Sequence, residues 1–190
     1  MALVNRLTKV LLGLMVAPVH SRIEGQGPDM SREFDARSDR YGRYFDEFEV
    51  GDIYRHWPGK TITESEHHLF CMVTMAGSPI HIDDNFAKKE MPGGKNLVLG
   101  TYIYALMTGM SVSDISGKAI ASLSVKDLQH LLPVFHGDTI YASTEILAMR
   151  ISQSKPAQGI LTVKTIGINQ NNETVCTFER SVMLPLKKRD

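Results

Sequence analysis

Four segments in the second half of the chain alternate apolar and polar residues as half-buried strands do. They span residues 118–129, 138–152, 159–169 and 174–184. Turn-forming sequences separate them, including His136-Gly137-Asp138 and an asparagine-rich stretch at 169–172. The pattern predicts antiparallel strands joined by short connections.

An uncharged segment precedes these strands. Residues 97–112 contain no charged side chain and follow a glycine-rich entry at 92–94. Such a segment favours one helix that must be covered on most sides. An antiparallel sheet curled around the helix covers it economically, so we expect an α+β hot-dog fold, a sheet wrapped around a long central helix. One copy leaves a sheet edge and a helix end exposed, which predicts a homodimer or higher homo-oligomer.

The segment before the central helix reads as a weak strand followed by a helix. Residues 54–63 are strand-like but interrupted, and Thr63 with Glu66 forms a capping-box pattern. The helix is expected over residues 64–75, ending before Pro79 because proline disfavours helical geometry in its predecessor.

Composition limits the possible partners. The 190 residues are 43% hydrophobic and 22% charged, as expected for one globular domain. Twenty-one basic residues balance 21 acidic ones. The long-range attraction that brings proteins to nucleic acids or anionic membranes is therefore absent, and neither partner is expected.

Residues 1–40 are expected to form an extension, flexible or docked as a short amphipathic helix, before a domain at 41–190. Its apolar run at 7–18 loosely resembles a signal peptide, but the cleavage pattern is poor and the run is too short for a membrane span. Cys71 and Cys176 lie far apart and suit buried thiols in a reducing compartment. We expect a cytoplasmic protein.

Four motifs carry a resemblance to a known family. They are "FCMVTMAGSPIHID" (70–83), "GMSVSDIS" (109–116), "PVFHGDTI" (133–140) and "SQSKPAQGI" (152–160). Together they are similar to the MaoC-like hot-dog dehydratases and hydratases over about residues 44–186. The last three resemble the branch that acts on mesaconyl-CoA, methylmalyl-CoA or itaconyl-CoA. The resemblance implies reversible hydration of an enoyl thioester, carried by CoA or acyl carrier protein, with no cofactor.

The resemblance also assigns candidate site residues. His81 matches the histidine that moves the proton, and the Gly100 N–H matches the donor to the thioester oxyanion. Ala76 occupies the position of the family's acidic residue, and Leu99 a position where relatives have histidine or asparagine. Both changes make the predicted substrate site more apolar.

Other polar residues have two interpretations. Ser78 could hold the water molecule or could simply form the turn before Pro79. Lys155 could meet a CoA phosphate or could be a solvated turn lysine. Asp83 and Asp84 are expected to cap a short helix rather than to catalyse.

No metal site is expected. His67, His68, His81 and Asp83 could be imagined as zinc ligands. However, adjacent helical residues point about 100° apart, and no recognised ligand spacing is present.

Three functions follow from these observations. The first is a hydro-lyase that hydrates an enoyl-CoA or dehydrates a 3-hydroxyacyl-CoA. The second is a hot-dog acyl-CoA thioesterase. The third is a catalytically degenerate subunit that binds acyl thioesters, since Ala76 and Leu99 both replace polar residues.

Overall fold

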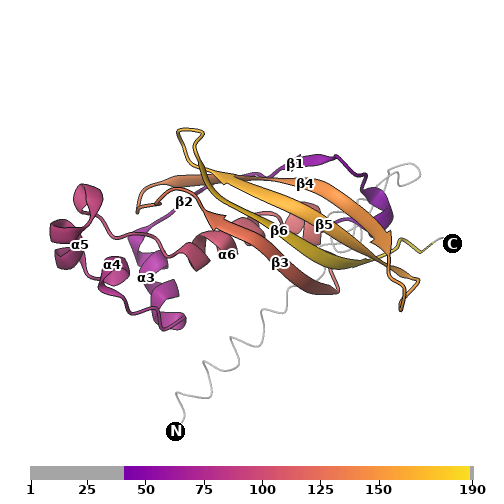
Figure 1. Ribbon diagram of the computed structural model, residues 1–190, viewed down its shortest axis with the longest axis horizontal. Coiled ribbons are helices and arrows are strands. Elements are labelled where there is room, and N and C mark those ends of the chain that lie inside the picture. The colour runs from indigo at the N-terminus through magenta and orange to yellow at the C-terminus, as the bar shows by residue number, and fades with distance from the viewer. Residues whose placement is uncertain (1–40, 189–190) are drawn as a thin grey trace, which may run out of the picture. The chain divides into compact units, whose positions relative to one another are not determined.

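One antiparallel sheet forms the body of the protein. The structure, a computed structural model, describes residues 41–188. Its strands are β1 (Ile53–Arg55), β2 (Lys60–Thr61), β3 (Ala121–His130), β4 (Thr139–Ile151), β5 (Gln158–Ile168) and β6 (Thr174–Pro185). The sheet order is β1-β4-β5-β6-β3, with β2 also paired to β4 (Figure 1). All four predicted strands of the second half are confirmed.

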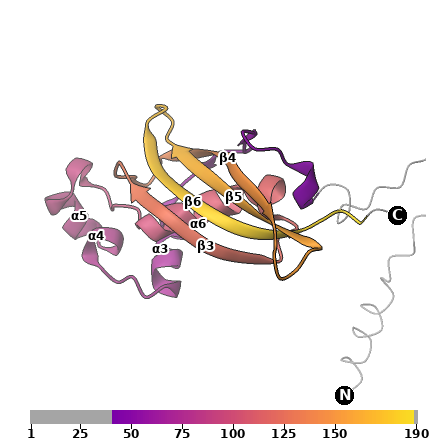
Figure 2. The same cartoon turned by 45° about the vertical axis from the view of Figure 1, so that its right-hand side comes forward.

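The central helix α6 (Gly100–Met110) packs inside the curve of this sheet, as Figure 2 shows. Ile103 and Met107 are its buried residues and belong to an apolar cluster with strand side chains such as Phe178. Gly167 of β5 permits the close approach, because a Cβ there would lie 2.5 Å from the Met107 sulfur. An antiparallel sheet curved around one helix is the arrangement that the sequence predicts.

The central helix differs from its prediction in two respects. The α-helix ends at Met110, and a π-helical turn, η3 (Val112–Ser116), follows, so residues 97–112 are not one regular helix. In addition, Thr101, Ala105 and Gly109 form an exposed stripe. One side of α6 therefore stays open within one chain, and the sheet covers the rest of the helix.

Three short helices form the end of the molecule nearest the start of α6 (Figure 1). They are α3 (Glu64–Val73), α4 (Pro79–Ile82) and α5 (Asp84–Glu90), with the 3-10 turn η2 (Pro92–Gly94) after them. The Thr63 N–H donates to Glu66 Oε1 at 2.9 Å, which forms the glutamate half of the predicted capping box. Asp83 caps α5 by accepting the Phe86 N–H at 2.9 Å. Asp84 lies in the first turn of α5 and is not its cap.

Helix α3 buries a histidine and a cysteine rather than its aliphatic side chains. His67 and Cys71 are its buried residues, whereas Leu69 and Val73 are 65% and 75% exposed. The buried side of α3 therefore supplies hydrogen-bonding groups next to the start of α6.

Buried polar groups hold the other end of α6. The Arg180 Nη2 donates to Ser111 Oγ at 2.7 Å, just beyond the helix. His56 lies 2.7 Å from Asp114 in η3 through Nδ1, and 2.8 Å from Thr144 in β4 through Nε2. These contacts fix the turn after α6 to strands β4 and β6, on either side of β5.

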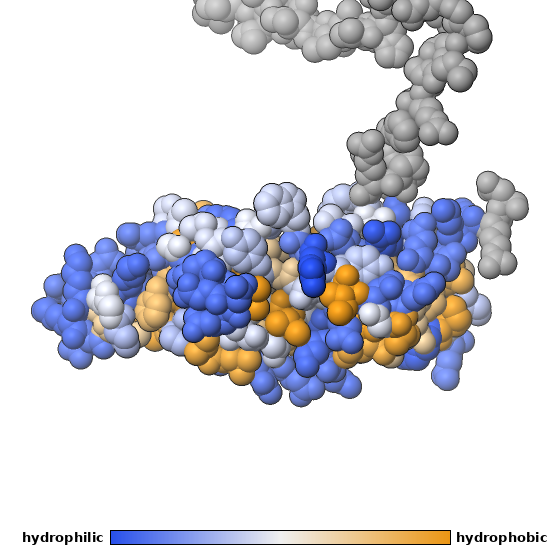
Figure 3. Space-filling view, turned by 90° about the horizontal axis from the view of Figure 1, so that it is seen from above, coloured by the Kyte–Doolittle hydropathy of each residue, from blue (hydrophilic) through white to orange (hydrophobic). Residues whose placement is uncertain are grey.

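The surface is mixed in character. Figure 3 shows hydrophilic residues over the end that carries α5, and hydrophobic groups between hydrophilic ones farther along. Among the described residues, no helix is both long and apolar enough for a membrane crossing. The extension predicted at residues 1–40 lies outside the described residues. Cys71 and Cys176 are both free and buried, as expected, and burial raises the pKa of Cys176 to about 11.

Two glycine substitutions test this packing. At Gly159 of β5 a new Cβ would overlap the Phe45 ring, whereas at Gly109 of α6 it meets no atom within 4 Å. We expect Gly159→Ala to lower the free energy of unfolding by about 1–3 kcal/mol. Gly109→Ala should raise it by about 0.5–1 kcal/mol, because alanine favours the helix. Chemical denaturation measures both, and equal effects would contradict the described contacts.

Candidate active site

His81 presents one basic nitrogen beside the loop that leads into α6. It lies in α4 and is 8% exposed. Its Nδ1 is 2.7 Å from the Leu97 carbonyl oxygen. Because a carbonyl only accepts, Nδ1 must carry the proton, and in the neutral ring the lone pair lies on Nε2. The geometry therefore suits a proton acceptor at Nε2.

Reciprocal hydrogen bonds fix this ring to the loop. The Leu97 N–H donates to the Ile80 carbonyl at 3.0 Å, in the direction opposite to the His81 bond. The buried Asn96 side chain is oriented so that both its amide oxygen and its amide nitrogen have hydrogen-bond partners. In this orientation the oxygen accepts the N–H groups of Ile82 and Asp83, each at 3.2 Å. Residues 96–97 and α4 therefore form one rigid unit.

The start of α6 is capped by a histidine from another helix. Leu99 is the N-cap residue but has no polar side chain. Its N–H donates to His67 Nε2 at 2.9 Å, and His67 is fully buried. His67 Nδ1 lies 2.8 Å from His136 Nε2. Burial, followed by the neighbouring His136, lowers the pKa of His67 to about 4, so its ring is neutral near pH 7.

Gly100 offers a free backbone donor at the start of α6. Among the described residues, no acceptor pairs with its N–H. The helix dipole adds partial positive charge at this position, which favours a developing anion. The His130 ring covers the Gly100 backbone, since a Cβ there would lie 2.7 Å from His130 Nε2. A Cβ at position 100 would require the His130 ring to move.

A pocket of about 360 Å³ opens beside Gly100. Its size suits a small ligand. Its walls are mostly aliphatic: Leu97, Val98, Ile103, Leu131, Leu132, Pro133, Val134 and Val175. Among these described lining residues and Gly100, His130 alone adds a polar side chain. His81 is not among the residues that line this pocket. A larger pocket of about 600 Å³ between Arg43 and Lys187 includes neither Gly100 nor His81.

Ala76 and Ser78 lie in the connection between α3 and α4, close in sequence to His81. The Ala76 N–H donates to the Cys71 carbonyl at 2.9 Å, and its side chain offers only a methyl group. The Ser78 carbonyl accepts the His81 N–H at 3.0 Å, while the Ser78 hydroxyl makes no capping bond. Ser78 therefore forms the turn, and its exposed hydroxyl is available to water.

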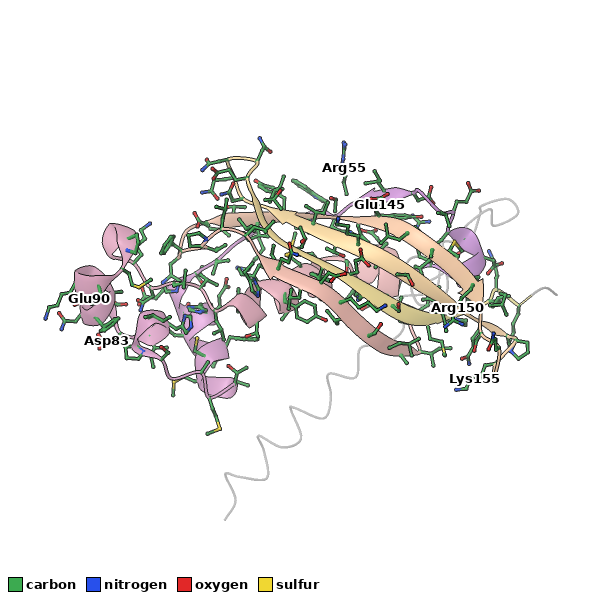
Figure 4. All side chains as sticks on the ribbon, viewed as in Figure 1. Arg55, Asp83, Glu90, Glu145, Arg150 and Lys155 are labelled. Atoms are coloured by element: carbon green, nitrogen blue, oxygen red, sulfur yellow. The ribbon has the colours of Figure 1, made fainter. Side chains whose placement is uncertain are left out.

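Lys155 does not join the other candidates. It lies in the turn between β4 and β5, and Figure 4 shows it at the end of the sheet opposite to Asp83 and Glu90. His81 precedes Asp83 by two residues and belongs to that opposite end. Within one chain, Lys155 is therefore separated from the predicted site.

The histidines near α3 were predicted to diverge, and this prediction is wrong. Ring nitrogens of His67, His68 and His136 lie within 4.8 Å of one another, because His136 approaches from the turn before β4. However, His67 Nδ1 and His136 Nε2 face each other in a hydrogen bond, and His67 Nε2 accepts the Leu99 N–H. Both ring nitrogens of His67 are therefore used in hydrogen bonds within the protein. Glu64, His68 and Asp84 form a second, largely exposed group.

Sequence reasoning missed His130, His136 and the structural role of His67. His130 ends a strand and lies in none of the four motifs. His136 lies in the "PVFHGDTI" motif, but the sequence predicted only a turn there. The contacts of both depend on strands that are distant in sequence from α3 and α6.

Solved structures place this architecture in a known class. A MaoC domain protein described as a putative dehydratase, from Chloroflexus aurantiacus, matches with a TM-score of 0.72 and 26% identity over 78% of this chain and 41% of that chain. The (R)-hydratase of A. caviae, involved in PHA biosynthesis, matches with a TM-score of 0.60 and 29% identity over 73% and 98%. The fold is the hot-dog fold of MaoC-like proteins.

The chain belongs to the mesaconyl-CoA hydratase family, whose model matches residues 30–189. The mesaconyl-CoA hydratase of Cereibacter sphaeroides is 31% identical over 150 residues, which are 78% of this chain and 42% of that protein. The beta-methylmalyl-CoA dehydratase of Chloroflexus aurantiacus is 30% identical, over 74% of this chain and 44% of that protein. The (R)-specific enoyl-CoA hydratase of Aeromonas caviae is 30% identical over 66% and 89%. The chain thus spans less than half the length of the first two relatives.

Proposed function

We propose that this protein reversibly adds water to the C2=C3 bond of an enoyl-CoA thioester. The observation that carries the proposal is the pairing of a fixed base with a free oxyanion donor. His81 donates from Nδ1 to the Leu97 carbonyl, which leaves Nε2 as the nitrogen that can accept a proton. The Gly100 N–H, three residues beyond Leu97, has no partner among the described residues. The names of the relatives, which are hydratases and a dehydratase, support this reaction.

The proposed steps balance without a cofactor. The thioester oxygen accepts the Gly100 N–H, which draws electrons from the double bond. His81 Nε2 takes a proton from water while the water oxygen bonds to C3. The resulting enolate collapses and C2 takes the proton from His81, which returns the ring to its neutral form. Dehydration is the reverse sequence.

The pocket supports a short, branched acyl group as substrate. Its aliphatic walls suit a methyl branch, and His130 offers the single side chain there that can bond a free carboxylate. We propose a C4 or C5 dicarboxylic acyl thioester, in line with the names of the relatives, mesaconyl-CoA hydratase and beta-methylmalyl-CoA dehydratase.

Replacement of His81 tests the proton transfer. We expect His81→Ala to lower kcat for hydration of mesaconyl-CoA by about 10²- to 10⁴-fold, the usual contribution of a general acid/base. Loss of the enoyl absorbance in the ultraviolet measures the rate. Arg150→Ala, an exposed change on β4, is the control and should retain the parent rate. Equal rates for His81→Ala and the parent would remove His81 from the mechanism.

A carboxylate introduced at position 76 tests whether His81 needs the acidic residue that the family has there. Ala76→Asp places an acid five residues before His81, where it can orient water. We expect kcat to rise by about 10²-fold, at the low end of a general acid/base contribution. A lower rate in Ala76→Asp than in the parent would instead show that the site is rebuilt around Ala76, because a new charge in an apolar site is costly.

The same assays separate the other two functions. Release of free CoA without loss of the double bond would assign a thioesterase. Binding of acyl thioesters with no turnover by the parent or by Ala76→Asp would assign a non-catalytic binding subunit, which Ala76 and Leu99 favour through their apolar side chains.

We propose that the chain works as a homodimer in the cytoplasm. Strand β3 lies at the edge of the sheet and, within the described residues, pairs only with β6. Exposed apolar side chains lie along and beside it: Ile120, Leu123, Val125, Leu128, Leu131 and Leu132. Two copies would also approach the length of the longer relatives, of which this chain spans 42–44%. The two buried free thiols support a reducing compartment.

A charged residue on the β3 edge tests the dimer. The parent should show a mass of twice 21.2 kDa by light scattering. Leu123→Lys should shift it toward the monomer, because the new charge would be buried between copies. Ile151→Lys, a change of similar exposure at the end of β4, is the control and should leave the mass unchanged. A monomeric parent would contradict the proposal.

A further inference from the structure

We propose that His67 is the positioning residue of this site, setting both the oxyanion donor and the base through one buried ring. The inference rests on the hydratase function proposed above. His67 comes from α3, yet it contacts the start of α6 and the ring of His81 in α4. No sequence motif marks it, and its contacts appear only in the folded chain.

The contact with α6 determines where the Gly100 N–H points. The first N–H groups of a helix have no partner within the helix and need an acceptor from elsewhere. Leu99 has no polar side chain to cap the helix, and its own N–H is held by His67 Nε2 at 2.9 Å. The peptide that carries the Gly100 N–H begins at Leu99. The hydrogen bond to the Leu99 N–H therefore fixes the backbone at the start of α6, and with it the direction of the Gly100 N–H.

The contact with His81 places the base by packing. The rings of His67 and His81 lie 6.1 Å apart between centroids, in a T-shaped arrangement at 84°. Tyr102, one turn into α6, packs edge-on against His67 at 5.7 Å. The base, the buried ring and the helix therefore form one packed unit, so a displacement of His67 moves both halves of the site.

His136 fixes the tautomer that this role requires. A backbone N–H only donates, so His67 Nε2 must be unprotonated and Nδ1 must carry the proton. Nδ1–H then points at His136 Nε2, 2.8 Å away, which accepts it. One proton arrangement of two neutral rings satisfies both bonds. A proton added to either ring would place two N–H groups facing each other in one of these bonds. Burial also lowers the pKa of both His67 and His136, which favours the neutral rings.

His67 does not itself exchange protons with substrate. Both its nitrogens are engaged, and the residue is 0% exposed. Substitutions of His67 are therefore expected to change the rate at which bound substrate is converted, and not the affinity for substrate. An oxyanion donor acts mainly in the transition state, and its loss appears in kcat.

Three variants separate positioning from a purely structural role. His67→Leu removes the acceptor, and kcat for mesaconyl-CoA hydration should fall about 10- to 100-fold with KM changed less than about threefold. His67→Gln keeps an oxygen near the Nε2 position and should recover most of kcat. Ile146→Val, a conservative change in the distant core cluster, is the control for lost stability and should leave kcat unchanged.

Two readouts do not depend on activity. Amide hydrogen exchange should show a protected Leu99 N–H in the parent and in His67→Gln, and an unprotected one in His67→Leu. Nitrogen-15 NMR should report a single neutral tautomer of His67, with the proton on Nδ1, throughout the physiological pH range.

Each outcome bears on a stated part of the inference. An unchanged kcat in His67→Leu, with Leu99 exchange increased, overturns the positioning role and leaves the hydratase standing. Equal losses of kcat in Leu and Gln variants, or an Nε2-protonated ring, also overturn it. A parent that binds mesaconyl-CoA without hydrating it defeats the proposed function, and the positioning role with it.

Discussion

The start of α6 has no capping side chain of its own, and the surrounding structure is arranged to supply what is missing. Leu99 is the N-cap residue, so its backbone depends on a ring from α3. An unsatisfied N–H inside a protein costs about 1–3 kcal/mol, which makes this bond a strong constraint on how α3 packs. It also accounts for the burial of His67 in a helix whose aliphatic residues Leu69 and Val73 are exposed.

The same constraint assembles the candidate site. Three histidines from three elements approach the 97–100 segment: His67 on the Leu99 N–H, His81 on the Leu97 carbonyl, and His130 over Gly100. Each makes a contact of a different kind, and together they leave the Gly100 N–H unpaired. A backbone donor that is held in place but not used by the protein can act on a ligand without reorganisation.

The other end of α6 is held by polar groups of a different kind. Arg180 reaches across from β6 to Ser111, and His56 links η3 to β4 through Asp114 and Thr144. Arg180 is 4% exposed, and burial lowers the pKa of its guanidinium. With its ends fixed, the helix cannot slide along the sheet, and the position of its N-terminus relative to the pocket is fixed as well.

The amino-acid sequence by itself determined the order of elements, because alternating residues define strands and an uncharged run defines a buried helix. The family resemblance suggested His81 and Gly100 as site residues, and a local pattern predicted the Asp83 cap. Only the tertiary structure decided that one side of α6 stays open, and that Lys155 lies at the opposite end of the sheet. It alone brought His67, His130 and His136 to the start of the helix. The reason is physical: periodicity reports which face of an element is buried, but the partner of a buried polar group lies on another element, at a distance along the chain that no local pattern encodes.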